Sequence, residues 1–151
     1  MHHLAQVNIA RLLYPIDSPQ LLGFTSRLDA VNALAEAAPG FVWRLVGDGN
    51  DATSLRPFPD PELIINMSVW ENVDALFDFT YRQADHTAVM RGRRDWFARP
   101  DRAHMALWWV PAGQVPTLAD ARERLDHLEG HGPTPFAFTF KQRFAAPATH
   151  P

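Results

Sequence analysis

The sequence has no cysteine among its 151 residues. That absence excludes disulfides, thiol nucleophiles and thiolate metal ligands from the protein's chemistry. Long apolar runs are also missing, since no stretch reaches the roughly 18 residues that a membrane-spanning helix requires. Residues 1–15 contain no basic segment followed by an apolar run of signal-peptide length. We therefore expect a cytoplasmic protein that makes no contact with membranes.

A net basic charge is absent as well. The formal net charge of −3 at pH 7 argues against nucleic acid as a partner, because phosphate binding needs a basic face. The phosphate-loop, dinucleotide-binding and G-x-S-x-G motifs do not occur. His127 and His131 in "HLEGH" depart from the zinc-protease pattern, in which glutamate directly follows the first histidine. No metal site is therefore expected.

The composition is that of a soluble globular protein, and the length predicts one domain over residues 1–151. Alternating side chains predict strands over residues 4–12, 41–47, 62–70, 104–111 and 135–144. Apolar residues at helical spacing predict helices over 27–38 and 117–130, the second capped by Thr117. Residues 48–61 are rich in Asp, Asn, Gly and Pro and read as a surface loop.

The segment 71–100 is long enough for one bent helix or two consecutive helices, with Glu71 or Asn72 as the N-terminal cap. The order is then βαββαβ followed by one helix and one strand. This order predicts an α+β, ferredoxin-like fold, with helices on one face of an antiparallel sheet. The other face also carries large apolar residues, and exposed apolar patches of that size usually mark an interface. We therefore expect a homodimer in which the two sheets face each other as a dimeric α/β barrel.

Within that segment, "YRQADHTAVMRGRRDWF" combines four arginines, a histidine and large aromatic residues. On a continuous helix, one face presents His86, Met90, Arg93 and Phe97, and the strip beside it includes Tyr81 and Trp96. A neutral histidine there suits a general base, a ligand contact or a haem ligand, but a structural histidine bonded to a strand carbonyl also fits the pattern. Arg91 and Arg94 fall on another side and are expected to face solvent.

Two stretches carry a family resemblance: "SVWENVDALFDFTYRQADH" with "RRDWF", and "ALWWVPAG" with "HGPTP" and "AFTF". They resemble the DUF3291 family, which is similar to the antibiotic-biosynthesis-monooxygenase-like dimeric α/β barrels. The resemblance implies a homodimer with a pocket between sheet and helices in each subunit. The wider superfamily includes cofactor-free oxygenases, isomerases, haem proteins and stress-response barrels, so the fold alone does not choose a reaction.

The leading hypothesis is a small-molecule enzyme of this superfamily that abstracts a proton from an aromatic or polyketide-like substrate. His86 would be the base, and Asn8, Arg93 and Tyr81 would stabilise the developing oxyanion. Monooxygenation or isomerisation would follow. The residues expected to contact substrate are Trp70, Met90, Trp96, Phe97 and Trp108, one of the adjacent pair Trp108 and Trp109 that must point to opposite sheet faces.

Two alternatives stay open. One is a non-catalytic barrel that binds an apolar ligand or serves a stress response. The other is a haem protein, because haem-degrading members of the superfamily combine a first-strand Asn, a Trp and a helical His, for which Asn8, Trp70 and His86 are loose analogues. No cofactor is required by the leading hypothesis, and a small-molecule ligand is the expected partner besides the second subunit.

Overall fold

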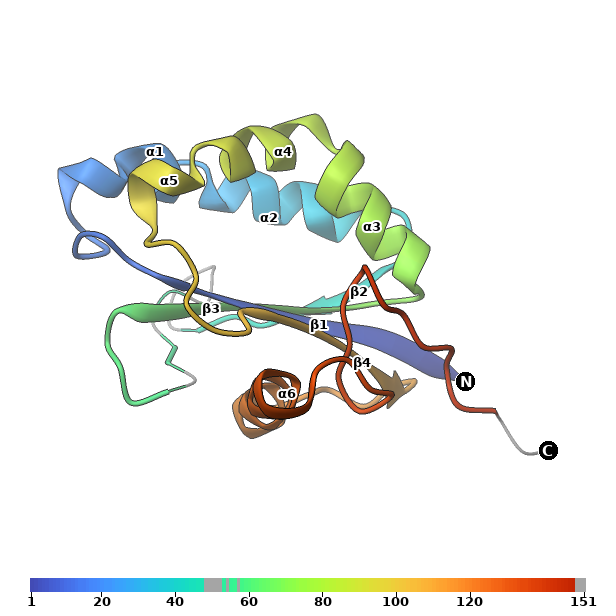
Figure 1. Ribbon diagram of the computed structural model, residues 1–151. Coiled ribbons are helices and arrows are strands. Elements are labelled where there is room, and N and C mark those ends of the chain that lie inside the picture. Colours follow the sequence, from blue (N-terminus) through green and yellow to red (C-terminus); the bar gives the residue numbers. More distant parts are fainter. Residues whose placement is uncertain (48–52, 54, 57, 149–151) are drawn as a thin grey trace.

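The computed structural model in Figure 1 describes residues 1–47, 53, 55–56 and 58–148. Of the predicted loop 48–61, residues 48–52, 54 and 57 lie outside the described residues. The strands are β1 (His2–Arg11), β2 (Phe41–Arg44), β3 (Leu63–Trp70) and β4 (Met105–Pro111). The helices are η1 (Pro19–Leu21), α1 (Leu22–Thr25), α2 (Leu28–Ala37), α3 (Val73–Arg82), α4 (Ala84–Arg91), α5 (Arg93–Trp96) and α6 (Leu118–His131).

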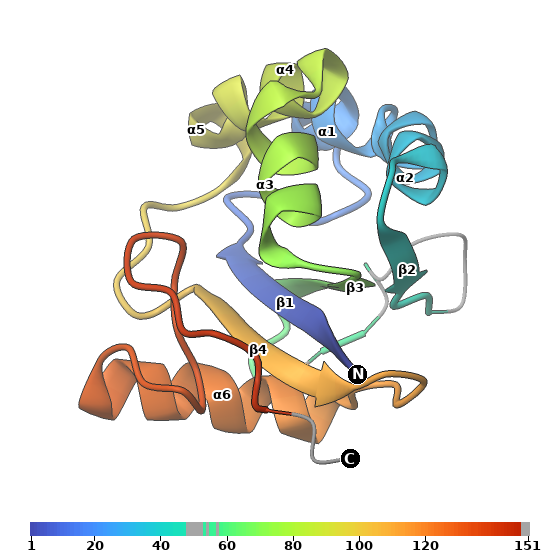
Figure 2. The same cartoon turned by 90° about the vertical axis from the view of Figure 1, so that its right-hand side faces the viewer.

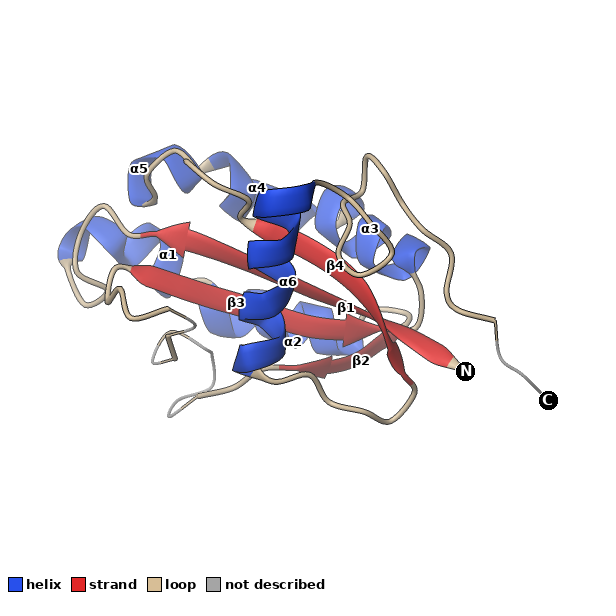
Figure 3. Cartoon of the chain, turned by 60° about the horizontal axis from the view of Figure 1, so that its bottom comes forward, coloured by secondary structure: helices blue, strands red, loops and turns tan. Residues whose placement is uncertain are grey.

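The described strands form one antiparallel sheet in the order β2-β3-β1-β4. This is the strand order of the ferredoxin-like fold, so the predicted fold class is confirmed. Helices α1 to α5 lie over one face of the sheet, as Figures 1 and 2 show. We call this face the helix side. Helix α6 crosses the strands on the opposite face, which is visible in Figure 3 and which we call the α6 side.

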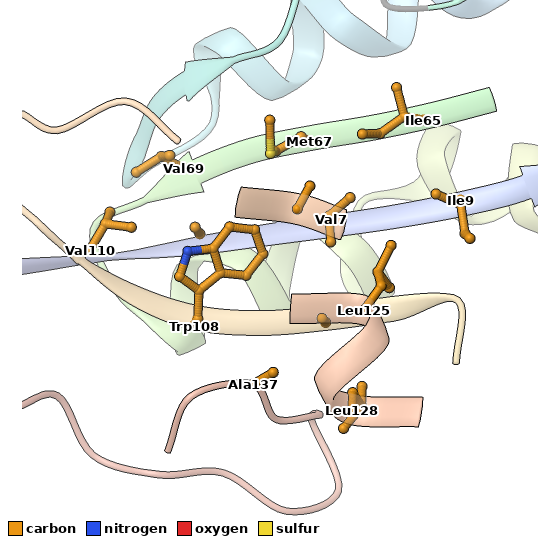
Figure 4. Close-up of a cluster of buried hydrophobic side chains, with 13 residues drawn as sticks. Val7, Ile9, Ile65, Met67, Val69, Trp108, Val110, Leu125, Leu128 and Ala137 are labelled. Carbon is orange, nitrogen blue, oxygen red and sulfur yellow. The ribbon is translucent and has the colours of Figure 1, made fainter. Parts of the chain in front are cut away.

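The prediction that a single chain leaves the second face of the sheet uncovered is wrong. A single chain was expected to leave this face open to water, but α6 of the same chain covers part of it. Leu125 and Ala121 of α6 are fully buried against the sheet, with Val7, Met67 and Trp108 among the strand residues of the same cluster (Figure 4). Thr117 caps α6 as predicted, in a reciprocal capping box with Asp120. The homodimer stays a prediction, and a sheet-to-sheet interface would have to accommodate α6.

The segment 71–100 forms three short helices rather than one or two. Asn72 caps α3 by accepting a hydrogen bond from the Ala75 amide at 2.8 Å. The first break is Gln83, whose extended backbone (φ −76, ψ 118) ends α3 and whose side chain caps α4. The second is Gly92, where an added Cβ would lie 2.4 Å from the Trp96 ring, so only glycine lets that ring approach. A face shared by His86, Arg93 and Phe97 needs a continuous helix and is therefore not formed.

The predicted last strand over 135–144 is reduced to two isolated bridges, of which one joins it to the sheet. Phe138 and Leu107 exchange two backbone hydrogen bonds of 2.8 Å at the edge of β4. The aromatic side chains that follow pack on the helix side as well. Phe140 packs its ring 5.6 Å from each of Phe77 and Tyr81 of α3, and the carbonyl of Phe144 accepts from the indole of Trp109 at 2.8 Å. The segment is thus held by side chains rather than by a ladder.

Candidate functional site

A row of polar side chains crosses the helix side of the sheet at its centre. Gln6 and Asn8 of β1 stand opposite Ser68 and Asn66 of β3 in the antiparallel register. The Gln6 amide nitrogen donates to Asn66 Oδ1 and to Ser68 Oγ, both at 2.8 Å. Asn8 Nδ2 donates to Gln6 Oε1 at 3.1 Å and to Asn66 Oδ1 at 3.3 Å. We call these four residues the carboxamide row.

The row is anchored at one end and open at the other. Gln6 and Ser68 are buried, Asn8 is half-buried and Asn66 is exposed. The two amide hydrogens of Gln6 are both used inside the row. Asn66 Oδ1 accepts two hydrogen bonds, whereas its Nδ2 has no partner among the described residues. Two N–H donors are therefore held at a fixed place near solvent, and no described residue accepts from them.

Apolar clusters lie on both sides of the row. Toward one end of the strands, Leu4, Trp70 and Leu107 pack with α3. Toward the other end, Ile64 packs with Phe24 and Trp96. Trp70 contacts both the polar row and an apolar cluster. Its indole nitrogen donates to Ser68 Oγ at 2.8 Å, and its ring stacks on Phe79. Neutral donors between apolar walls suit an uncharged ligand that carries a carbonyl oxygen.

His86 lies one ring further from the row. Its ring centroid is 4.9 Å from that of Phe79, which in turn is 5.3 Å from Trp70. Its Nδ1 lies 2.9 Å from the carbonyl oxygen of Thr80, and a carbonyl only accepts, so Nδ1 carries the hydrogen and the lone pair is at Nε2. Burial lowers the pKa of His86, while the bond to Thr80 opposes this shift. The imidazole is therefore neutral at pH 7 and does not contact the row directly.

The other residues predicted to stabilise an oxyanion are not gathered with Asn8. Arg93 is exposed and, with Met90, lines a shallow depression on the outer surface of α4 and α5. Tyr81 is 45% exposed and packs its ring on Phe140 of the C-terminal segment. Of the four residues placed together by the sequence analysis, only Asn8 belongs to the carboxamide row.

The residues predicted to contact substrate are also divided. Trp96 is buried in the apolar cluster at one end of the row and packs on Phe24, as does Phe97 beside it. Trp108 is 1% exposed and lies on the α6 side (Figure 4). The Arg124 guanidinium is 5.5 Å from its ring centre. Trp108 cannot reach a ligand at the row, because the sheet lies between them. Its neighbour Trp109 faces the helix side, as the opposite orientation of adjacent strand residues requires.

The arrangement of Asn8, Trp70 and His86 leaves no space between them for a haem group. Asn8, Trp70 and His86 do not surround a common cavity, because the Phe79 ring contacts both Trp70 and His86. A porphyrin between them would have to displace that ring. Among the described residues, no group of three His, Asp or Glu side chains is placed to hold a metal ion. No helix in the described ranges is long and apolar enough to cross a membrane.

Sequence reasoning missed Gln6, Asn66 and Ser68. The signal was present, since two polar residues at alternate positions interrupt the apolar strand "LIINMSVW". A strand buried on both faces ordinarily reads as a continuous apolar run. What the sequence did not provide was the register that sets Asn66 opposite Asn8 and Ser68 opposite Gln6.

The chain belongs to the family described as "Domain of unknown function (DUF3291)", which matches residues 3–151. No curated protein matches it. Similar solved structures include the NE2512 protein of unknown function from Nitrosomonas europaea (14% identity, 78% of this chain and 97% of that chain, TM-score 0.50). Another is Rv0793 from Mycobacterium tuberculosis (11% identity, 76% and 99% covered, TM-score 0.50). SnoaB, a cofactor-independent oxygenase from Streptomyces nogalater, has 16% identity, 76% and 97% coverage and a TM-score of 0.48. At these identities the likeness concerns the fold.

Proposed function

We propose that this member of the DUF3291 family is a small-molecule enzyme that removes a proton from a carbon next to a carbonyl group in an apolar, aromatic or polyketide-like compound. The observation that carries the proposal is the pair of N–H donors on Asn66 Nδ2, which have no acceptor among the described residues and are held by the carboxamide row between apolar clusters. Loss of the proton turns the carbonyl oxygen into an enolate oxygen. Fixed N–H donors that bind this anion more strongly than the neutral carbonyl lower the barrier to its formation.

The fixed position of Asn66 is what makes the donors effective. Its Oδ1 is restrained by two hydrogen bonds, from Gln6 and Asn8, and Gln6 is itself bonded to the buried Ser68. The amide therefore need not reorganise when charge develops on the ligand oxygen. No carboxylate belongs to the row, so nothing within it repels a developing enolate.

His86 is the proposed base. It is neutral at pH 7, and its tautomer leaves Nε2 free to take a proton. Because Phe79 stands between Trp70 and His86, the base acts on a ligand that extends from the row toward α4. The enolate then either takes the proton back at another carbon, which is isomerisation, or reacts with O2. In the second case a CH2 and O2 become a C=O and water.

The test uses anthrone, a tricyclic aromatic ketone with an acidic CH2. In D2O without oxygen, the hydrogens of this CH2 exchange for deuterium, and proton NMR monitors the loss of their signal. The exchange rate reports proton abstraction, whichever step follows it. We expect exchange above the buffer rate by at least about tenfold, and a fall of about tenfold or more in His86→Gln. His104→Gln, at an exposed histidine before β4, is the matched control and should exchange at the wild-type rate.

The exchange rates test separately whether His86 is the base and whether the protein is catalytic. If exchange is unchanged in His86→Gln, the base is another group, and the oxyanion role of Asn66 still stands. If wild-type protein binds anthrone but exchange stays at the buffer rate, the protein is a binder of apolar ligands and the catalytic proposal is wrong.

A further inference from the structure

Three arginines surround one depression on the outer surface of α4 and α5. Its volume is about 350 Å³, and it is lined by Thr87, Met90, Arg91, Arg93 and Arg94. The three guanidinium-bearing residues are exposed, and Met90 is half-buried and supplies an apolar wall. Thr87, Met90 and Arg91 belong to α4, and Arg93 and Arg94 begin α5 directly after Gly92, so the depression spans the junction of the two helices.

None of these arginines forms an ion pair or hydrogen bond within the described part of the chain, which sets them apart from several others. Arg11 pairs with Asp60 at 2.6 Å, and Arg82 pairs with Asp78 at 3.1 Å. The stretch 86–94 contains no carboxylate, and the neighbouring Asp95 forms no ion pair with these arginines in the described part of the chain. Three like charges around one depression repel each other, and an anion bound among them removes that repulsion.

The helix dipole does not account for the group. Arg91 is in the last turn of α4, where a cation is favourable, but the capping amide of Gly92 already satisfies the carbonyls of Val89 and Met90. Helix α5 has four residues, too few for a substantial dipole, and yet it carries both Arg93 and Arg94. A charge surplus is therefore concentrated at one place on a protein whose net charge is −3.

We propose that this depression binds the phosphate group of a small molecule that has an apolar body. Guanidinium groups donate paired N–H bonds to phosphate oxygens, and three of them match a dianion better than a single carboxylate. Met90 contacts the apolar part. The site is separate from the carboxamide row, so its existence does not depend on the proposed reaction.

The experiment measures binding of phenyl phosphate and of inorganic phosphate by calorimetry at low ionic strength. Phenyl phosphate should bind with 1:1 stoichiometry and at least about threefold more tightly than inorganic phosphate, because its ring can contact Met90. Arg93→Gln and Arg94→Gln should each weaken phenyl phosphate by about tenfold. Arg99→Gln removes the same charge from an exposed position outside the depression and should change affinity by less than about twofold.

Met90→Ser gives an independent readout. It should abolish the preference for phenyl phosphate while leaving inorganic phosphate binding unchanged. The proposal is overturned if neither compound saturates the protein below about 10 mM. It is equally overturned if Arg99→Gln weakens binding as much as Arg93→Gln does, which would show general charge attraction without a site.

Discussion

Asn8 and Asn66 stand opposite each other on β1 and β3, and Asn8 Nδ2 donates to Asn66 Oδ1 at 3.3 Å. Gln6 donates to the same oxygen at 2.8 Å, so the Asn66 carboxamide is fixed with its own N–H groups directed away from both partners. The half-buried Asn8 and the buried Gln6 thus orient an exposed donor. This arrangement is the basis for the chemistry proposed above.

Gln6→Leu should destabilise the protein by about 1–3 kcal/mol, because Asn66, Ser68 and Asn8 each lose a partner inside the row. Urea denaturation measures the change in unfolding free energy. Gln114→Leu, at an exposed position after β4, is the control and should have little effect. A Gln6→Leu protein with the unfolding free energy of the wild type would show that the hydrogen bonds of the carboxamide row do not stabilise the fold.

His86 should make stability depend on pH. Its folded-state pKa lies below its ordinary value near 6.5, mainly because of burial. The unfolded chain therefore binds the proton first as the pH falls. The unfolding free energy is then fully present above about pH 6.5 and decreases below it, until the folded-state pKa is passed.

Urea denaturation at a series of pH values between 7.5 and 5 measures this slope. His86→Gln should reduce the acid-side loss of stability relative to the wild type, whereas His104→Gln at an exposed site should keep it. If the two variants have the same slope as the wild type, His86 does not titrate as its buried position requires.

The two tryptophans Trp70 and Trp108 should behave differently. Each is 1% exposed, so replacement by Phe should cost roughly 1–3 kcal/mol of stability in either case. Trp70→Phe also removes the hydrogen bond to Ser68 and should slow anthrone exchange, whereas Trp108→Phe on the α6 side should leave exchange unchanged. Stability comes from urea denaturation and exchange from NMR. Equal effects on exchange would mean that the ligand does not occupy the helix side.

Local sequence signals predicted much of the fold. Alternation identified the strands of the sheet. Capping residues marked two helix starts, one at Thr117 and one at Glu71 or Asn72, and the structure shows Thr117 and Asn72 as the caps. The order of elements then predicted the ferredoxin-like sheet. These features depend on residues close together in the chain, where spacing and side-chain chemistry are visible directly.

The candidate site was less predictable, since it depends on register and on helix breaks. Arg93 was placed with His86 by assuming one helix, and a glycine required by the nearby Trp96 ring ended that helix. Asn66 was overlooked because its partner is 58 residues away. Trp108 was assigned to the ligand, although strand alternation allowed either face and the packing of α6 decided it.

The most direct test of the central claim is anthrone exchange in Asn66→Asp. This change keeps an oxygen that accepts from Gln6 and Asn8 but replaces the two outward N–H donors with a negative charge. We expect wild-type protein to exchange the CH2 hydrogens at least about tenfold faster than buffer and Asn66→Asp to return to the buffer rate. Gln114→Glu, the same chemical change at an exposed site, should exchange at the wild-type rate. Exchange by folded Asn66→Asp at the wild-type rate would contradict the account.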